Sequence, residues 1–281
     1  MLTPFADLLA ARRDGLAVGA FTCYDLETAT AALNAAAAAR AGVILLIGSR
    51  SYTSAGGDLL LAALLAAARR AEAAACVQLD HCADLAVISA ALEAGAGAVM
   101  ADGSAFPFER NAAFVAGAVE LAREHGASVE AELGGIGGDE DVAEAVEAGA
   151  LTDPAEALEF MGRTGADCLA VSIGNVHGIY REPPRLDWAR LDAIRERVAA
   201  PLSLHGASGI PDDLVRRAVA AGVAKINVNT ELRQAYLAAT EGIIGAVLAG
   251  SRVNALHSAQ ASAVEDVVAA KLRAFDTRGG A

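Results

Sequence analysis

The sequence is poor in positive charge. Its 281 residues contain 22 Lys and Arg against 35 Asp and Glu, which gives a formal net charge of −13. An excess of this sign opposes binding to the phosphate backbone of nucleic acid or to an anionic membrane. We therefore expect neither nucleic acid nor a membrane as a partner, and favour a protein that acts on small molecules.

Cysteine is scarce, and long hydrophobic runs are absent. The four cysteines form no Cys-x-x-Cys pair and are too few for a disulfide-stapled secreted domain. The chain starts without a basic segment followed by an apolar one, and its longest aliphatic stretch, 59–68, is far shorter than the roughly 20 residues that span a bilayer. These observations predict a cytoplasmic protein.

Several catalytic motifs are also missing. The sequence has no G-x-G-x-x-G, Walker A, G-x-S-x-G or H-E-x-x-H pattern. Lysine occurs only at Lys225, inside a predicted strand, and at Lys271, in a predicted terminal helix. This scarcity disfavours chemistry through a lysine Schiff base.

What is present is a regular alternation of short apolar segments and longer Ala- and Leu-rich segments of helical period. Eight such pairs without a flexible linker favour one (β/α)8 barrel spanning 1–281, with 251–281 as a helical extension. The predicted strands are Ala17–Thr22, Val43–Ile47, Cys76–Leu79, Ala98–Ala101, Ser128–Leu133, Cys168–Ser172, Pro201–Leu204 and Ala224–Val228.

The terminal helix is predicted to be amphipathic. Its apolar residues are Ala261, Val264, Val267, Val268, Leu272 and Phe275. This face can cover a neighbouring subunit or pack on its own barrel, and the sequence does not decide between the two.

Three of the five histidines fall at predicted strand ends. His81 follows the third strand, His177 the sixth, and His205 ends the seventh. Because catalytic residues of such barrels lie at the carboxyl ends of strands, three imidazoles there match a catalytic zinc with three protein ligands. His125 and His257 are interpreted as a helix-end residue and a surface residue.

Carboxylates fall at the same end of the barrel. Asp80 precedes His81, Asp102 ends the fourth strand, and Glu132 ends the fifth. A glycine-rich loop follows, with Asp139, Glu140 and Asp141. Such a loop could bring a catalytic base over a substrate, or be a solvated acidic turn.

The last two strands lead into a different kind of site. The segments 205–211 and 227–231 each pass from a strand into a helix through small residues. Helix starts after strands seven and eight commonly bind phosphate in this fold, because their unpaired N–H groups favour an anion. A phosphorylated substrate is therefore predicted, while Ser208 and Thr230 can also serve as helix caps.

Five motifs together resemble the class II, zinc-dependent ketose-bisphosphate aldolases, which include fructose- and tagatose-bisphosphate aldolases. The resemblance follows the chain in order, through segments 78–84, 129–141, 173–178, 204–209 and 225–231. It implies a lyase of carbohydrate metabolism, such as glycolysis, that releases dihydroxyacetone phosphate.

The resemblance also implies roles for individual residues. His81, His177 and His205 match the zinc ligands, Glu132 and Asp102 match weaker or alternative metal positions, and a monovalent cation is a second candidate cofactor. Asp80 matches the acid/base at the C4 hydroxyl, and Glu140 the loop carboxylate that takes a proton from dihydroxyacetone phosphate. Residues expected around the substrate and its phosphate are Ser49, Gly178, Gly206, Ala207, Ser208, Asn227, Val228, Asn229, Thr230 and Arg252.

The substrate is left open between related sugars. Asn175-Val176 before His177 resembles fructose-type members, so fructose 1,6-bisphosphate is the first choice and tagatose 1,6-bisphosphate or another phospho-keto-sugar the alternative. A phosphosugar isomerase or epimerase, or a non-catalytic barrel, is a more distant alternative. Family members commonly carry Asn where this chain has Thr22.

The distal phosphate and the assembly are the least determined features. Arg252 and Arg50 are the candidates for the second phosphate, because a guanidinium binds phosphate bidentately. The resemblance further implies a homo-oligomer, a dimer or tetramer, and triose phosphates as products.

Overall fold

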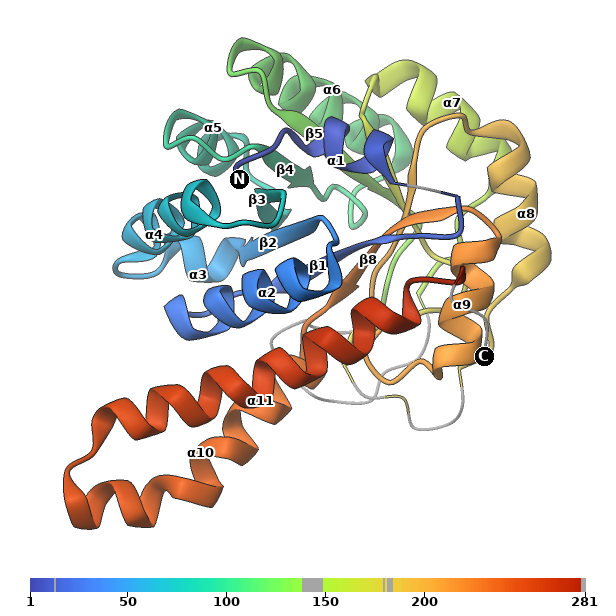
Figure 1. Ribbon diagram of the computed structural model, residues 1–281. Helices are drawn as coiled ribbons and strands as arrows, with labels where there is room; N and C mark the ends of the chain where they lie inside the picture. Colours follow the sequence, from blue (N-terminus) through green and yellow to red (C-terminus); the bar gives the residue numbers. More distant parts are fainter. Residues whose placement is uncertain (13, 138–148, 179, 181–183, 279–281) are drawn as a thin grey trace.

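The computed structural model describes residues 1–12, 14–137, 149–178, 180 and 184–278. Eight parallel strands close into a barrel in the order of the sequence, with β8 beside β1, so the predicted (β/α)8 fold is confirmed (Figure 1). The strands are β1 (Val18–Thr22), β2 (Val43–Gly48), β3 (Ala75–Cys82), β4 (Ala98–Ala101), β5 (Ser128–Leu133), β6 (Cys168–Val171), β7 (Leu202–Leu204) and β8 (Val223–Val228).

Helices surround the barrel on the outside (Figure 1). Those of the described residues are α1 (Phe5–Ala11), α2 (Leu26–Ala39), α3 (Ser49–Thr53), α4 (Gly57–Arg70), α5 (Leu85–Glu93), α6 (Phe108–Glu124), α7 (Pro154–Thr164), α8 (Trp188–Arg197), α9 (Asp212–Ala220), α10 (Thr230–Gly250) and α11 (Val253–Ala274). None of the helices in the described part of the chain has the length and apolarity needed to cross a membrane.

The strands are buried on both faces, but the two faces differ in chemistry. Side chains alternate along a strand, so Val77 and Leu79 of β3 point outward into the apolar layer beneath the helices. The alternate residues Cys76, Gln78 and Asp80 point into the barrel. A single strand therefore supplies both the packing face and the polar interior.

The barrel interior changes from apolar to polar along its axis. At the amino ends of the strands, Phe5 and Leu8 of α1 pack against Val18, Ile44 and Cys76 and close that end. From the middle of the barrel to the carboxyl ends of the strands, the inward positions are polar and buried, and include Glu130, Glu132, Ser203, His205, Lys225 and Asn227. The chemistry of the chain is thus concentrated at one end of the barrel, as this fold requires.

The predicted terminal helix is α11, and it forms an antiparallel pair with α10 that projects beyond the barrel (Figure 1). Val264, Val268 and Leu272 are buried where α11 packs on α2, and the Phe275 ring stacks on Phe21 of β1 at 6.5 Å. The apolar face of α11 therefore packs on its own barrel, which is one of the two arrangements that the sequence left open.

Candidate active site

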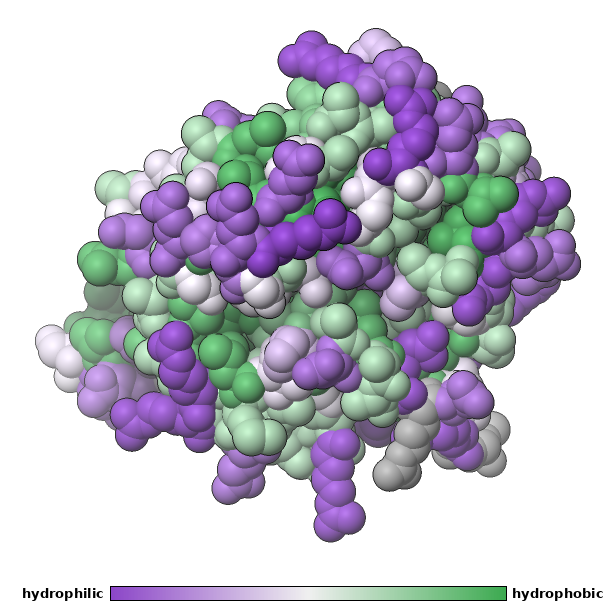
Figure 2. Space-filling view, turned by 90° about the horizontal axis from the view of Figure 1, so that it is seen from above, coloured by the Kyte–Doolittle hydropathy of each residue, from purple (hydrophilic) through white to green (hydrophobic). Residues whose placement is uncertain are grey.

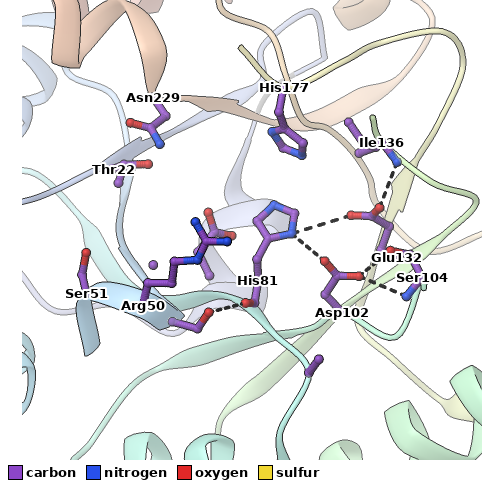
Figure 3. Close-up of a pocket in the computed structure, with 14 residues that line it drawn as sticks. Thr22, Arg50, Ser51, His81, Asp102, Ser104, Glu132, Ile136, His177 and Asn229 are labelled. Atoms are coloured by element: carbon purple, nitrogen blue, oxygen red, sulfur yellow. Dashed lines mark hydrogen bonds and ion pairs between the residues drawn. The ribbon is translucent and has the colours of Figure 1, made fainter. Parts of the chain in front are cut away.

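A cavity of about 450 Å³ opens at the carboxyl ends of the strands. Most of the predicted catalytic and metal-binding side chains line it (Figure 3). The lining residues are Thr22, Gly48, Ser49, Arg50, Ser51, Asp80, His81, Ala83, Asp102, Ser104, Glu132, Ile136, His177 and Asn229. His205 lies directly beneath them, buried against His81.

The three predicted histidine ligands converge. Each offers a ring nitrogen, and these nitrogens all lie within 4.8 Å of one another. His81 Nε2 and His205 Nδ1 face each other at 3.0 Å. Nitrogens at such distances can share a single metal ion, because tetrahedral Zn–N bonds of about 2.0–2.1 Å place two ligand nitrogens a little over 3 Å apart.

Two of these rings are oriented by carboxylates on their other nitrogens. His81 Nδ1 lies 2.8 Å from Asp102, and His205 Nε2 lies 2.8 Å from Glu130. A carboxylate that accepts the proton of one ring nitrogen leaves the other nitrogen unprotonated and directed at the site. Burial lowers the pKa of His205 to about 4, against the opposing effect of Glu130, so this ring is a neutral potential ligand.

His81 occupies an unusual backbone conformation. The structure corrects its predicted position after the third strand, because β3 continues through Cys82, with an irregular register between Leu79 and Cys82 where it pairs with β4. The φ of His81 is 44°, in the left-handed region that non-glycine residues rarely adopt. The Ser49 hydroxyl donates to the His81 carbonyl oxygen at 2.6 Å, and so helps to hold this conformation.

A buried ionic network supports the histidines from below, and the sequence analysis did not predict it. Glu130 accepts hydrogen bonds from His205 and Gln78 and pairs with Lys225 Nζ at 2.8 Å. Burial alone would raise the pKa of Glu130, but Lys225 and His205 outweigh it and hold that pKa well below its usual value. The signal was available, because polar residues at alternate positions of an otherwise apolar strand indicate an inward-facing polar set.

The pKa of Glu132, the second carboxylate near His81, is shifted in the opposite direction from that of Asp102. Burial, and next to it the charge of Asp102, raise the pKa of Glu132 to about 8. Its Oε2 atom is buried without a hydrogen-bond partner among the described residues, 3.9 Å from His81 Nδ1. Hydrogen bonds from His81 and Ser104 lower the pKa of Asp102, although burial opposes them.

These observations test whether the residues fit a metal ion, and they do. A donor set of three imidazoles with two oriented rings is the chemistry of a catalytic zinc site. His81, Asp102 and Glu132 form a second group of potential ligand atoms that shares His81 with the first group. The unpartnered oxygen of Glu132 is an atom that a cation or a substrate hydroxyl would satisfy.

Asp80 is fully buried beside the histidines and lines the cavity. The Asn227 amide lies 3.4 and 3.5 Å from its two carboxylate oxygens, and the same amide nitrogen is 3.2 Å from His205 Nδ1. The predicted acid/base therefore lies within reach of the metal site without being part of either group of potential ligands.

A small second hollow adjoins the cavity, and the predicted phosphate residues line it. Its walls are His177, Gly178, Gly206, Ser208, Asn227, Asn229 and Thr230. Asn229 is the N-cap of α10 and Thr230 its first residue, so the amino end of this 21-residue helix, where the first N–H groups have no partner within the helix, lies at the hollow. Ala207 and Val228 are buried, and can contribute only their backbone atoms.

Gly206 has a further structural reason to be glycine. Its φ is 62°, and a Cβ atom there would lie 2.1 Å from the carbonyl oxygen of Val176. Val176 directly precedes His177, so any side chain at 206 would displace the loop that carries a metal ligand. The close approach of these two loops is what brings His177 toward His205.

The two arginines predicted to bind the distal phosphate, Arg50 and Arg252, lie in different parts of the structure. Arg50, on α3, points into the cavity on the other side of His81 from Asp102 and Glu132 (Figure 3). Arg252 is exposed at the turn between α10 and α11, at the tip of the projecting pair, and does not line this cavity, so its role at the distal phosphate stays a prediction (Figure 1). Its sequence position had no motif to place it on the barrel.

Three predicted loop carboxylates, Asp139, Glu140 and Asp141, lie outside the described residues. His125 caps the end of α6, and His257 of α11 pairs with Glu27 of α2; neither histidine lines the cavity. In the sequence, Thr22 stands out only as a departure from a family pattern. Its buried hydroxyl lines the cavity and has no hydrogen-bond partner among the described residues, so a substrate atom can bind there.

A closed (β/α)8 barrel with three convergent histidines, a buried carboxylate beside them and a small polar hollow at a helix start is the arrangement of an enzyme active site that can hold a metal ion. Residues 6–280 match the family model described as "Fructose-bisphosphate aldolase class-II". The chain belongs to this family of class II ketose-bisphosphate aldolases, and is thus an aldehyde-lyase.

Individual relatives agree with the family. A D-tagatose-1,6-bisphosphate aldolase subunit GatY of Klebsiella oxytoca is 46% identical over 230 residues, which are 82% of this chain and 81% of that protein. The solved YdjI aldolase of Escherichia coli K12 is 30% identical with a TM-score of 0.86, over 99% of both chains. A structure titled putative fructose-1,6-biphosphate aldolase from Coccidioides immitis is 30% identical with a TM-score of 0.90, over 98% and 96% of the two chains.

Proposed function

We propose that this aldolase cleaves a ketose 1,6-bisphosphate between C3 and C4 into dihydroxyacetone phosphate and glyceraldehyde 3-phosphate, and also catalyses the reverse condensation. The observation that carries the proposal is the position of Asp80, which lines the cavity together with His81 and His177 and shares the Asn227 amide with His205. The small polar hollow at the start of α10 suits the phosphate on C1, and leaves the rest of the sugar in the larger cavity.

In the proposed cleavage, Asp80 and the three histidines have distinct roles. Asp80 takes the proton of the C4 hydroxyl, so that the C4–O bond becomes the aldehyde carbonyl while the C3–C4 bond breaks. The electron pair stays on the three-carbon keto fragment, which then takes up a proton at C3. A zinc ion held by His81, His177 and His205 would act as a Lewis acid on the negative charge that develops on this fragment.

Between the two sugars, we propose D-tagatose 1,6-bisphosphate as the preferred ketose and fructose 1,6-bisphosphate as the alternative. The tagatose aldolase subunit that is 46% identical supports this order. The sequence argument for fructose rested on Asn175-Val176. Asn175 is buried, donates to the carbonyl oxygens of Val171 and His205, and does not line the cavity, so it cannot contact the sugar directly.

The two ketoses are epimers at C4 and give the same two products, so the condensation reaction separates them. Purified metal-loaded protein is supplied with dihydroxyacetone phosphate and glyceraldehyde 3-phosphate, and the two bisphosphates are quantified by NMR. We expect tagatose 1,6-bisphosphate to exceed its epimer in the initial product. An excess of fructose 1,6-bisphosphate would reverse the order, and no C6 product would contradict the proposed reaction.

Arg50 is proposed to bind the phosphate on C6, because it lines the cavity from the side away from Asp102 and Glu132. Arg50→Ala should raise KM for the bisphosphate roughly 10- to 100-fold, the effect of losing a charge-assisted contact of about 1.5–3 kcal/mol. Binding of dihydroxyacetone phosphate, which lacks this phosphate, should be unchanged. Arg252→Ala tests the second predicted ligand in the same assay, and a raised KM for the bisphosphate in that variant alone would assign the distal phosphate to Arg252 instead. An equal effect of Arg50→Ala on both ligands would remove Arg50 from the distal position.

The metal and the compartment also belong to the proposal. Zinc is proposed as the metal because the donor atoms are three imidazole nitrogens. The cytoplasm is proposed because all four cysteines are free and buried, which suits a reducing compartment.

We further propose that copies of this chain associate through α10. The helix exposes Leu237, Ile244 and Leu248 on the projecting pair, whereas on the face in Figure 2 hydrophobic residues lie in small groups among hydrophilic ones. Sedimentation at micromolar concentration should show a dimer or larger species, and Leu237→Glu with Leu248→Glu should shift it to the monomer. A wild-type protein that sediments only as a monomer would contradict this assembly.

A further inference from the structure

Another hollow, larger than the catalytic cavity, lies at the opposite end of the barrel and is called the arginine hollow below. Its volume is about 890 Å³, and α2, α9 and the end of α11 form its walls. Leu16 precedes β1, Arg40 ends α2 before β2, and Ala220 ends α9 before β8. These positions follow helices and precede strands, so the hollow lies at the amino ends of the strands, away from the proposed active site.

The hollow is lined by an unusual number of arginines for an acidic protein. Five of the 22 basic residues of the chain face it, against two carboxylates, Asp213 and Asp276, although the whole chain carries a net charge of −13. The five are Arg40, Arg216, Arg217, Arg273 and Arg278. Like charges brought together in a concave surface repel one another, and an anion bound between them relieves that repulsion.

Contacts with neighbouring residues hold three of the guanidinium groups in place. Arg216 Nη1 lies 3.4 and 3.3 Å from the carbonyl oxygens of Arg273 and Asp276. Arg217 stacks over the Trp188 ring at 4.3 Å, and Arg278 donates to both oxygens of Asp276. Side chains that are already ordered lose less conformational entropy when a ligand binds.

The segment that carries the last two arginines is fixed to the barrel. Ala17 N donates to the Phe275 carbonyl oxygen at 3.1 Å, and Thr277 N donates to that of Gly15 at 2.8 Å. Leu16 and Leu272 add apolar surface to the same hollow. The walls are therefore built from packed elements and offer both positive charge and an apolar patch.

We propose that this hollow binds a small organic anion with at least two phosphate groups, at a site separate from the aldolase active site. Five arginines against two carboxylates leave a charge difference of three, which two or more phosphates would match. The concave shape favours a small molecule over nucleic acid, which the overall negative charge also repels. This inference does not depend on which sugar the enzyme cleaves.

The test uses the full-length, metal-loaded protein with inorganic pyrophosphate and with ADP as probes. Hydrogen–deuterium exchange locates each probe, because the catalytic site and the arginine hollow fall in different peptides. We expect slower exchange in peptides covering 212–220 and 270–278 at micromolar to low millimolar probe. If ADP protects these peptides at a lower concentration than pyrophosphate does, the ligand is a nucleoside polyphosphate. If the two probes protect equally, the site recognises only the phosphate groups of its ligand.

Variants link the protection to the arginines. Arg40→Gln with Arg278→Gln should weaken binding at this site about tenfold or more, and leave the KM and kcat of bisphosphate cleavage unchanged. Arg163→Gln, on α7 and paired with Glu109, is the matched surface control and should change neither property. A second double variant, Arg216→Gln with Arg217→Gln, should weaken binding in the same way. Its binding is interpreted only if its midpoint of thermal unfolding equals that of the wild type. No protection of these peptides, or equal binding by wild type and both pairs, would overturn the proposal.

Discussion

Removal of the bound metal by a chelator is expected to abolish ketose bisphosphate cleavage, and added zinc or cobalt is expected to restore it. The reason is the convergence of three imidazole nitrogens within 4.8 Å, two of them oriented by carboxylates. The alternative aldolase chemistry needs a lysine that can reach the substrate. Lys225 is fully buried in an ion pair with Glu130, and Lys271 pairs with Glu231 on the outer helices.

The loss of metal binding and activity should be larger for variants of residues closer to the metal site. His81→Ala removes a ligand, and should lose both metal content and activity. Asp102→Asn keeps the ligand but weakens its orientation, and should lower metal affinity by about 10- to 100-fold. His125→Ala, at the end of α6, is the matched control and should lose neither.

Metal content measured by mass spectrometry, alongside the initial rate of cleavage, checks this ranking. Activity that persists in metal-free protein would contradict the metal-dependent mechanism. Inactivation by borohydride in the presence of substrate would contradict it as well, because that result identifies a Schiff base.

Replacing Asp80 by Ala should reduce the turnover of ketose cleavage by about 10²- to 10⁴-fold, the usual loss for a general acid/base, while the metal stays bound. Asp80 lies beside the histidines but in neither group of potential ligands, so the two properties should separate. Asp84→Ala is the control, since this exposed residue caps α5 through the Ala86 N–H and does not line the cavity.

Glu140→Ala offers a contrast within the same assay. If the loop carboxylate acts on dihydroxyacetone phosphate, its loss should chiefly slow exchange of that ligand's proton with solvent, measured by NMR. Small and equal effects of the two variants would mean that Asp80 is not the acid/base and that Glu140 belongs to a solvated turn. Loss of metal from Asp80→Ala would instead make Asp80 part of the metal site.

Much of the fold could be predicted because its signals are local. Short apolar segments between Gly, Asn or Asp residues predicted all eight strands to within one residue at each end, except at the end of β3, which extends three residues further. There the chain continues through a register irregularity with a positive φ at His81, a conformation imposed by neighbouring strands and by Ser49. Propensity cannot show a contact of that kind.

Arg50 and Arg252 show the same limit for the site. Both are arginines near expected strand or helix ends, and the sequence offered no way to separate them. The turn into α3 directs Arg50 into the cavity, whereas the length of α10 carries Arg252 to the tip of the projecting helices. The difference depends on where a helix ends in space, which is a property of packing.

Residue spacing along single strands and turns was enough to predict the closed barrel of alternating strands and helices, the histidines and carboxylates at its carboxyl end, and the loops proposed to bind phosphate. Which of these groups meet depends on contacts between distant parts of the chain. The tertiary structure joined Glu130 to Lys225 and His205, packed α11 on its own barrel, and gathered five arginines from three helices and the chain segment after α11 into one hollow. These pairings link residues far apart in the chain, and barrel closure and burial select them.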